Sequence, residues 1–392
     1  GSSFTASGNS TYSEAAANRA TNAASLAGGA SQSAKVAVLN AQDSSAAVTA
    51  SANNATKLTL TGNSALVGSS ATLDGNSTSA AATGSAATNS IDVKSGGAIA
   101  GGLAALPATT TGPASSVTVS ADQALANVQL GAGAVSATAT GVVGIDTAPL
   151  SNVGTSTLGV TNNSQSAKAV SNTALNSVAL AGSNVGARSA LQSTQSGTAP
   201  VTASSTLELF APVASSASTI RISGNSNTAL GVMNDAANSL SVSAVNALPP
   251  GATGSATLSE TGSADNLAAS GDHVLSNRQS ASSTVSSTAS TSIHNDDNIV
   301  PGTQGLANGA LTISGNSTFA EASANRAANT VTVAGSAAQG ASTGIANVQG
   351  STATVTATAG TVANTTLAGA APLNGSSVSL DGNTTAALAR GN

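Results

Sequence analysis

The chain of 392 residues repeats its own sequence. Residues 7–85 align without a gap with residues 314–392, and roughly half of the aligned positions are identical. The segment SGNSTYSEAAANRATN at 7–22, for example, returns as SGNSTFAEASANRAAN at 314–329. Repetition over such a distance is typical of proteins in which each repeat is one structural unit that buries its apolar side against its neighbours. It predicts a stack of similar units rather than a single globular core.

A short motif opens each repeat, in which two alternating apolar residues precede Gly-Asn. In the last full repeat, Leu311 and Ile313 precede Gly315-Asn316. Alternation with a period of two indicates a half-buried strand, and Gly and Asn tolerate the positive φ of a tight turn. Each unit is therefore predicted to begin with a strand and a turn. The turn Asn residues are Asn9, Asn76, Asn225, Asn316 and Asn383, with Asn163 in a weaker copy.

Amide side chains recur at two further places in the repeat. Asn stands nine and thirteen residues after most turn Asn residues, and an Asn-x-Gln motif follows later, with Val six residues after the Gln. Amides at equivalent positions of stacked strands can hydrogen bond to one another. We therefore expect ladders of Asn and Gln along the stack. The predicted ladder residues are Asn18, Asn22, Gln42, Asn89, Gln129, Asn172, Asn176, Gln195, Asn234, Asn238, Gln279, Asn325, Asn329 and Gln349, besides the turn Asn residues.

These signatures divide the chain into modules of unequal length. The second and fourth modules are longer because about twenty residues enter before the Asn-x-Gln motif, and these insertions contain Leu106-Pro107 and Leu248-Pro249-Pro250. Pro and Gly interrupt strands, so the insertions are predicted to be loops that leave the sheet edge and provide variable surface. The module boundaries are 1–67, 68–154, 155–216, 217–307 and 308–374, followed by an incomplete module at 375–392.

The composition favours strands and stacking. Ser, Thr, Asn and Gly are abundant, whereas charged residues make up 6% of the chain and aromatic residues 1%. Ordering one residue costs roughly 1–2 kcal/mol, and burial of one methyl-sized group returns about 0.8 kcal/mol, so a module of mostly Ala, Val and Leu would be marginal alone. The predicted fold is all-β, a tandem-repeat β-solenoid or continuous β-stack, with a string of β-sandwich modules as the alternative. Val331 and Val333 are predicted strand residues of its apolar layer.

The charge and cysteine content exclude several classes of function. The chain has no cysteine, so it has neither a disulfide framework nor thiol chemistry. Its formal charge is −5, and nucleic-acid binding needs clustered Lys and Arg, so we expect no nucleic-acid partner. No run of eighteen apolar residues is present, and we expect no membrane span.

Candidate chemical sites are few. The segment around His294, Asp296 and Asp297 could offer imidazole and oxygen ligands to a metal, with calcium favoured over zinc, but a solvated polar loop is the favoured interpretation. Gly340 to Gly344 matches the G-x-S-x-G pattern, which Gly-rich and Ser-rich sequences contain by accident. We therefore expect no enzymatic activity and no cofactor. The aromatic residues Phe4, Tyr12 and Phe319 stand at repeat positions, as core or contact residues would.

The C-terminal segment suggests self-assembly. Residues 375–392 repeat the opening strand and turn of a module, and we expect them to lack sheet partners of their own. A second copy could supply those partners, and contacts that do not close into a ring produce filaments. The expected function is a secreted structural subunit that polymerises head-to-tail into an extracellular or cell-surface fibre or biofilm matrix filament, with itself as main partner and surface or matrix components as further ones. The predicted polymer contacts are Gly375, Val378, Leu380, Asn383 and Asn392.

In its regularly placed Asn, Gln, Gly and Ser, the chain loosely resembles curli-type functional amyloid subunits. The resemblance covers composition and the recurring Gly-Asn and Asn-x-Gln positions over most of the chain. Curli-type repeats are much shorter than these modules. The resemblance implies an extracellular fibre of biofilm type, held together by backbone hydrogen bonds.

Two other functions stay open at this point. A monomeric adhesin or ligand-binding stalk would use the insertions at 97–116 and 247–267 as its contact surface. An ice-binding solenoid is a variant, suggested by Thr pairs such as Thr138/Thr140 and Thr356/Thr358. Those Thr pairs do not stand at one fixed position of every module, as a flat binding face would require.

Overall fold

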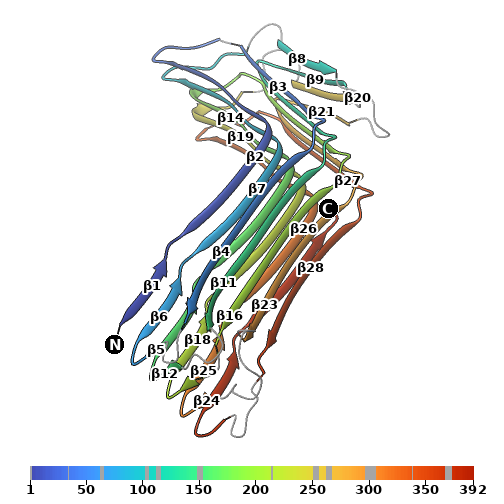
Figure 1. Cartoon of the computed structure of the whole chain (residues 1–392). Helices are drawn as coiled ribbons and strands as arrows, with labels where there is room; N and C mark the ends of the chain where they lie inside the picture. The colour runs from blue at the N-terminus through green and yellow to red at the C-terminus, as the bar shows by residue number, and fades with distance from the viewer. Residues whose placement is uncertain are drawn as a thin grey trace.

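The computed structural model is an all-β solenoid, in which each module forms one coil (Figure 1). Among the described residues there is no helix. Every coil runs outward along one layer of strands and returns along a second layer, which lies against the first. The described residues are 2–33, 35–61, 66–101, 106–111, 116–147, 153–212, 215–249, 256–261, 267–295, 306–337, 339–366 and 373–392.

Each coil repeats the same order of strands. In the first coil, β1 (Ser3–Ser7) and β2 (Ser10–Gly28) run outward, β3 (Val36–Ser44) and β4 (Val48–Leu60) return, and β5 (Leu66–Val67) leads to the next coil. The second coil has β6 (Ser70–Asp74), β7 (Ser77–Ser95), β10 (Gln123–Gly131), β11 (Val135–Thr147) and β12 (Val153–Gly154). The third has β13 (Thr157–Thr161), β14 (Ser164–Asn184), β15 (Ser189–Gly197), β16 (Val201–Ala211) and β17 (Ser215–Ser216). The fourth has β18 (Thr219–Ser223), β19 (Ser226–Ala247), β22 (His273–Ala281), β23 (Val285–Asn295) and β24 (Leu306–Ala307). The fifth has β25 (Ala310–Ser314), β26 (Ser317–Gly335), β27 (Thr343–Ser351) and β28 (Val355–Asn364), and the sixth opens with β29 (Ser377–Asp381) and β30 (Thr384–Arg390).

Equivalent strands of successive coils pair in parallel, so five continuous sheets run through the molecule. The two longest contain six strands each, in the orders β1-β6-β13-β18-β25-β29 and β2-β7-β14-β19-β26-β30. Sheets that cross every module boundary confirm the all-β stack and exclude the string of separate β-sandwiches. A stacked solenoid also explains why no module needs a wide core of its own.

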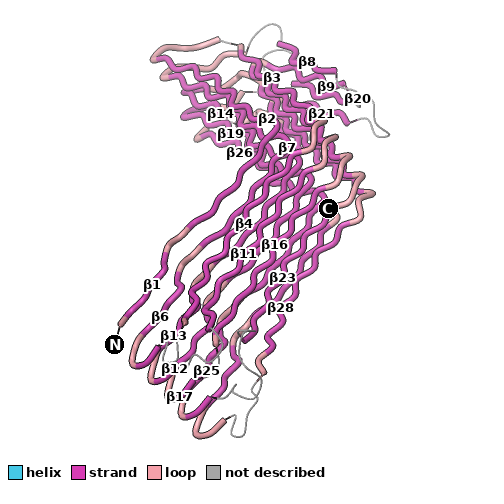
Figure 2. The backbone as a smooth tube through the Cα atoms, viewed as in Figure 1, coloured by secondary structure: helices cyan, strands magenta, loops and turns pink. Residues whose placement is uncertain are grey.

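The solenoid is bent within its long outward strands (Figures 1 and 2). In what we call the long arm, β1 and the first part of β2 pack against β4, whereas in the short arm the second part of β2 packs against β3, and the later coils repeat this arrangement. The core of the long arm contains one cluster rich in Ala, such as Ala80 and Ala137, and a second cluster of Leu and Ile, such as Leu73 and Ile145. The core of the short arm contains larger side chains, such as Ile91, Leu125 and Leu180.

The Gly-Asn motif produces a bend rather than a reversal. Gly75, Gly224 and Gly315 have φ values of 64°, 69° and 64°, and Asn162 takes the same conformation with φ of 55° where the third coil lacks the Gly. The strand before the motif and the strand after it continue in the same outward layer, as β1 and β2 do in Figure 2. The predicted positive φ is thus present, but the predicted tight turn is only a change of direction.

The Pro and Gly content of the insertions predicted loops, and this prediction is wrong. The insertions form two hairpins, β8 (Leu106–Thr111) with β9 (Ser116–Ala121), and β20 (Ala256–Thr261) with β21 (Leu267–Gly271). The hairpins pair antiparallel through β9 and β20, which gives an accessory sheet in the order β21-β20-β9-β8. Val117 and Val119 of this sheet pack on Ala124 and Ala190 of the short arm, and this burial offsets the loss of strand propensity at the Pro residues.

The opening of the sixth coil has sheet partners within its own chain. β29 pairs with β25 and β30 pairs with β26, so the prediction that residues 375–392 lack partners is wrong. The short arm of the fifth coil is not covered by a sixth coil, and Val331 and Val333 are therefore only half-buried. Their equivalents in the fourth coil, Leu240 and Val242, are fully buried.

Candidate functional site

The most regular feature of the molecule is a set of amide ladders that follow the solenoid axis. At the Gly-Asn motif of each coil, Nδ2 of the turn Asn donates to Oδ1 of the turn Asn in the next coil, at 2.8–2.9 Å. The backbone N–H of the same residue also donates to that Oδ1 in each coil, at 3.0–3.2 Å. These bonds satisfy buried amides that would otherwise destabilise the fold. The ladder contains Asn9, Asn76, Asn163, Asn225, Asn316 and Asn383.

A second ladder runs through the region where the two arms meet. Its side chains donate from each coil to the next at 2.8 Å throughout. The same Nδ2 groups also reach the return layer, where four of the five meet an Asn Oδ1 and Asn176 meets the Ser193 hydroxyl. This ladder therefore joins successive coils and also joins the two layers. It contains Asn22, Asn89, Asn176, Asn238 and Asn329.

A third ladder lies four residues earlier in the same strands and is interrupted in the second coil. Asn172, Asn234 and Asn325 donate in sequence, the last to Asn392, at 2.7–2.9 Å. In the second coil, Ser85 takes the place of an Asn and only accepts a long 3.5 Å bond from Asn18. Oδ1 of Asn172 is consequently buried without a donor among the described residues.

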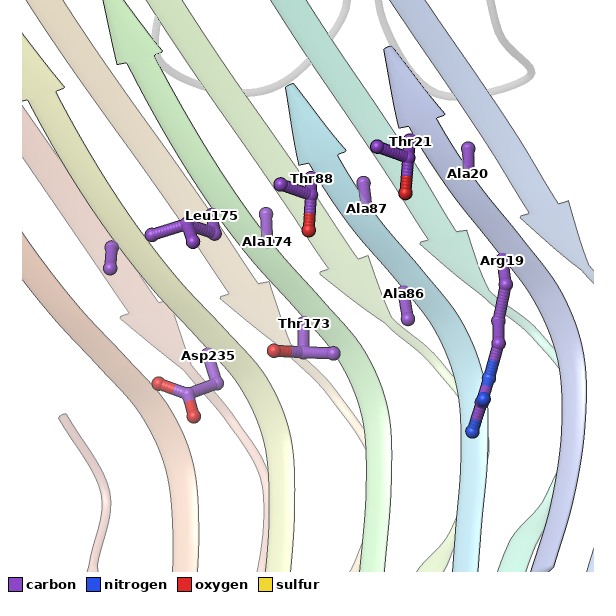
Figure 3. A pocket seen from close by; sticks show the side chains of 11 residues that line it. Arg19, Ala20, Thr21, Ala86, Ala87, Thr88, Thr173, Ala174, Leu175 and Asp235 are labelled. Carbon is purple, nitrogen blue, oxygen red and sulfur yellow. The ribbon is translucent and has the colours of Figure 1, made fainter. Parts of the chain in front are cut away.

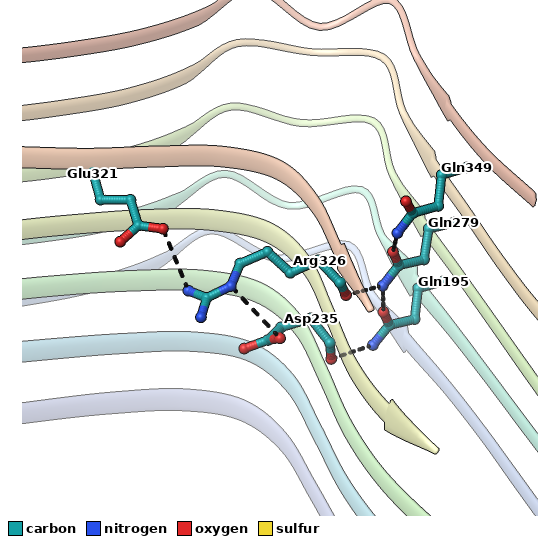
Figure 4. Close-up of polar contacts among 6 residues, drawn as sticks. All are labelled: Gln195, Asp235, Gln279, Glu321, Arg326 and Gln349. Atoms are coloured by element: carbon teal, nitrogen blue, oxygen red, sulfur yellow. Dashed lines mark hydrogen bonds and ion pairs between the residues drawn. The ribbon is translucent and has the colours of Figure 1, made fainter. Parts of the chain in front are cut away.

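The Gln ladder runs in the opposite direction. Each Gln Nε2 donates to Oε1 of the Gln in the preceding coil, at 2.6–2.8 Å, from Gln349 through Gln279, Gln195 and Gln129 to Gln42. Several of these Nε2 groups also donate to a carbonyl of the outward layer, as Gln279 does to Arg326 at 2.7 Å (Figure 4). The Gln ladder thus ties the return layer to the outward layer.

A buried ion pair and a second buried carboxylate, which sequence reasoning missed, lie where the chain re-enters the coils after the accessory hairpins. Arg188 donates through Nε to Oδ2 of Asp122 at 3.2 Å, and both side chains are buried. Asp272 accepts bonds from the backbone N–H and hydroxyl of Ser342 at 2.7 and 2.8 Å. Each Asp stands directly after the last strand of a hairpin, so the carboxylates fix the point where the chain re-enters the coil. An Asp directly after each insertion was the sequence signal that could have identified these residues.

A Ser, a His and an Asp meet in this region, but they are shielded from solvent. Nδ1 of His273 lies 2.9 Å from the hydroxyl of Ser189, and both side chains are buried. Burial lowers the pKa of His273 to about 4, against the opposing effect of Asp272. The imidazole is therefore neutral at neutral pH. Ser342, the central residue of the G-x-S-x-G match, lies ahead of β27 in extended chain and not at a strand-to-helix turn.

His294 belongs to a different cluster, on the outer side of the return layer. Its Nε2 lies 2.9 Å from Oε1 of Glu208, and its ring stacks on Phe210 with centroids 5.6 Å apart. Nζ of Lys57 lies 5.0 Å from the centre of the Phe210 ring on the side of the preceding coils. The other predicted metal ligands, Asp296 and Asp297, lie outside the described residues. Within the described part of the chain, no three His, Asp or Glu side chains gather as a metal site.

A shallow groove crosses the outer face of the outward layer at the bend (Figure 3). It has a volume of about 430 Å³ and is lined mainly by small side chains such as Ala86 and Thr173. Its charged residues are already paired, because Arg19 contacts Glu14 and Asp235 lies 4.0 Å from Arg326. The aromatic side chains do not line it: Tyr12 lies exposed on the outer face and donates to Glu14, so it is not a core residue.

Part of the outer face of the return layer in the long arm, beside the cluster of His294, is uniform and uncharged. Three successive outward positions of β4, β11, β16, β23 and β28 carry hydroxyl side chains in almost every coil. Thr alone does not recur at these positions in every coil, but a hydroxyl side chain, Thr or Ser, recurs in almost every coil. The Thr pairs in the sequence did not reveal this regularity. The three ranks are Thr49-Ser136-Thr202-Ser286-Thr356, Ser51-Thr138-Ser204-Thr288-Thr358 and Asn53-Thr140-Thr206-Ser290-Gly360.

The predicted polymer contacts lie on the last coil. Gly375, with φ of 63°, begins the sixth coil, and Val378 contacts the long-arm core. Leu380 is 55% exposed, so it is available for contact. Asn383 and Asn392 accept from the preceding coil and form the last steps of their ladders.

No family model, curated protein or solved structure matches this chain. The described residues also include no helix that could span a membrane.

Proposed function

We propose that this chain is a structural subunit of an extracellular fibre or biofilm matrix filament, extended head-to-tail by further coils of the same repeat. The observation that carries the proposal is that each of two amide ladders keeps one polarity along its whole length. From the first coil to the fifth each turn Asn side chain donates to the following coil, and from the second coil to the fifth each Gln side chain donates to the preceding one. A ladder with one polarity can continue across a joint between two copies without a mismatch.

The two end faces of the solenoid are complementary in this respect. Among the described residues, Oδ1 of Asn9 and Asn22 accept from no preceding coil, and Nε2 of Gln42 donates to the Ala86 carbonyl but to no Gln of a preceding coil. At the last coils, Asn383 offers Nδ2 and Gln349 offers Oε1. Both faces also present open strand edges, which favour the addition of another strand. Contacts between two different faces that do not close produce a filament.

The stepped surface of the last described coil supports a joint that begins at β29 and β30. β29 and β30 cover only β25 and the first part of β26, so a copy that stacks on them meets Leu380 and Asn383 first. The resemblance to curli-type subunits supports the same reading, since both would be held together by backbone hydrogen bonds. An exported subunit without cysteine would also be insensitive to the redox state outside the cell.

The experiment is negative-stain electron microscopy of the full chain and of residues 1–374 after prolonged incubation. We expect uniform filaments from the full chain and soluble, β-rich monomers from the shorter one. Single rods from the full chain would overturn the proposal. Filaments from both would retain the polymer but remove the role of β29 and β30, because flush stacking of complete coils would then suffice.

The uniform hydroxyl face favours a second candidate, a stalk that binds a flat surface. Each Ser or Thr hydroxyl both donates and accepts, and β pairing sets a spacing of about 4.8 Å between coils and roughly 7 Å along each strand. The absence of charges and aromatic rings among these fifteen positions fits ordered water at an ice surface better than a sugar polymer. Thr138→Lys with Thr288→Lys should abolish inhibition of ice recrystallisation if this function is real. No inhibition by the unaltered chain would dismiss it.

A further inference from the structure

The strands of the accessory sheet have the same spacing along the solenoid axis as the coils. β8 lies against β3 and β10, β9 against β10 and β15, β20 against β15 and β22, and β21 against β22 and β27. Each accessory strand therefore lies over the junction of two successive coils, and the four strands cover four successive junctions (Figure 1). Paired strands are about 4.8 Å apart in both sheets. The accessory sheet thus advances by one strand for each coil.

This relation explains why insertions alternate with plain coils. One hairpin supplies two strands, which occupy about 9–10 Å along the axis, and two coils rise by the same amount. The second and fourth coils carry hairpins and the third carries none. A hairpin on every coil would need twice the available length. Alternate hairpins can instead continue the sheet for as long as coils are added.

The β21 edge of the accessory sheet is open among the described strands. Ala269 of β21 takes the same place as Val119 of β9, three residues before the Asp that follows each hairpin. Val119 is fully buried, whereas Ala269 is only half-buried at the margin of the same apolar cluster. The difference is what a missing neighbour strand produces.

The surface beyond this edge resembles the part of the accessory sheet's floor that the second coil supplies. Ala124, Ala126 and Val128 of the second coil are buried under the accessory sheet. In β27 of the fifth coil, the equivalent positions are Gly344, Ala346 and Val348, whose side chains are small or apolar and which are half-buried. An additional strand over β27 would therefore rest on a surface of the same kind.

We propose that the open edge of β21 binds an antiparallel strand with the sequence of β8, supplied by the insertion hairpin of another copy of this repeat. The directions of β8, β9, β20 and β21 alternate, so the next strand must run as β8 and β20 do. The repeat order agrees, because residues 375–383 repeat residues 68–76, which open the hairpin-bearing second coil. The inference rests on the proposed function only in taking its partner from another copy.

The existing joint between the hairpins predicts the register. In that joint Thr118 of β9 lies opposite Ser259 of β20. The equivalent positions in β21 and β8 are Ala268 and Thr109, because each hairpin pairs its two strands in the same way. Pro107 lacks an N–H, which an edge strand tolerates, so the new bonds would come from the residues that follow it. Ala268 should therefore lie opposite Thr109 of the added strand.

The test is a disulfide between the chain and a synthetic peptide of residues 106–121, at a concentration where the chain is monomeric. The chain has no cysteine, so Ala268→Cys in the chain and Thr109→Cys in the peptide report one pair only. Ala268 is exposed, and this change should leave the fold intact. The double variant Thr118→Cys/Ser259→Cys, which should close within one chain, calibrates the geometry of such a joint.

We expect a saturable one-to-one adduct whose yield is at least tenfold above that of a scrambled peptide and of a peptide with Thr111→Cys instead. Equal yields from both registers, or no adduct above the scrambled peptide, would overturn the inference. The result is independent of filament formation. An adduct without filaments would refute only the proposed fibre, and filaments without an adduct would refute only the β21 joint.

Discussion

The fourth and fifth coils have equivalent strands in the same register, yet they are buried to different extents. Leu240 and Val242 of the fourth coil are fully buried between two neighbours, whereas Val331 and Val333 of the fifth are covered on one side only. The two pairs are similar in chemistry and in place. The comparison teaches that burial in this molecule comes from adjacent coils more than from the sequence of any one coil, as expected of a repeat stack.

The largest expected effect is a charge placed in the apolar layer. Leu240→Asp should destabilise the solenoid by about 4 kcal/mol or more, because an unpaired carboxylate would be fully buried. Val331→Asp should cost roughly half as much, since its side chain can reach water at the uncovered side. Chemical denaturation followed by far-ultraviolet circular dichroism measures both. Equal losses would contradict the dependence on neighbouring coils.

The second effect is a loss of stability in acid through His273. Its pKa is about 4 in the fold and 6.5 when unfolded, so the unfolded chain takes up the proton first. Stability should fall as the pH drops from about 6.5 to about 4, by roughly 3 kcal/mol in all. His273→Gln should remove this slope from urea titrations at several pH values. A His at the equivalent position of the fifth coil, introduced as Thr343→His in that variant, should restore little of it, because Thr343 is exposed.

The third effect compares ladder steps. Asn225→Ala in the interior should cost about 2–3 kcal/mol, because it removes the acceptor of the buried Asn163 backbone N–H and of one Nδ2 hydrogen, and one of the two donors to the buried Asn316 Oδ1. Asn383→Ala at the end of the same ladder should cost about 1 kcal/mol, because water reaches Asn316 there more readily. Thermal unfolding of the two variants decides the matter, and a larger loss at Asn383 would count against the ladder account.

The smallest effect is a gain. Ser85→Asn supplies the amide that the second coil lacks and gives a donor to the buried Oδ1 of Asn172. It should stabilise the chain by about 1 kcal/mol. Ser90→Asn, on the outer face of the same strand, should have no such effect. An unfolding midpoint for Ser85→Asn at or below that of the unaltered chain would show that the gap in the ladder carries no penalty.

The sequence predicted the stack and the position of its amides because both depend on repetition. Equivalent residues of a parallel solenoid become neighbours, so a recurring Asn such as Asn225 identifies its own hydrogen-bond partners. The roles of Ser85 and Ser193 as ladder partners could not be predicted from repetition, since a Ser stands there in place of the recurring Asn.

The insertions and the arrangement of the arms could not be predicted in the same way. Pro107 indicated a loop, but it lies in β8, where pairing within and between the two hairpins outweighed the local preference. The ion pair of Asp122 and Arg188 joins successive coils, and Asp272 stands at the equivalent position of the next coil, so the residue type does not repeat there. Single positions with a unique residue carry no periodic signal, although they determine how the accessory sheet is attached.

Hydrogen exchange of the full chain, resolved along the sequence by mass spectrometry, tests the central claim of one continuous stack most directly. The account predicts that the strands with neighbours on both sides, β14 and β19 above all, exchange slowest, and that β1, β28 and β30 at the two end faces exchange fastest. Protection that is the same for β2, β7, β14, β19 and β26 would contradict it, because each module would then be stabilised independently of its neighbours.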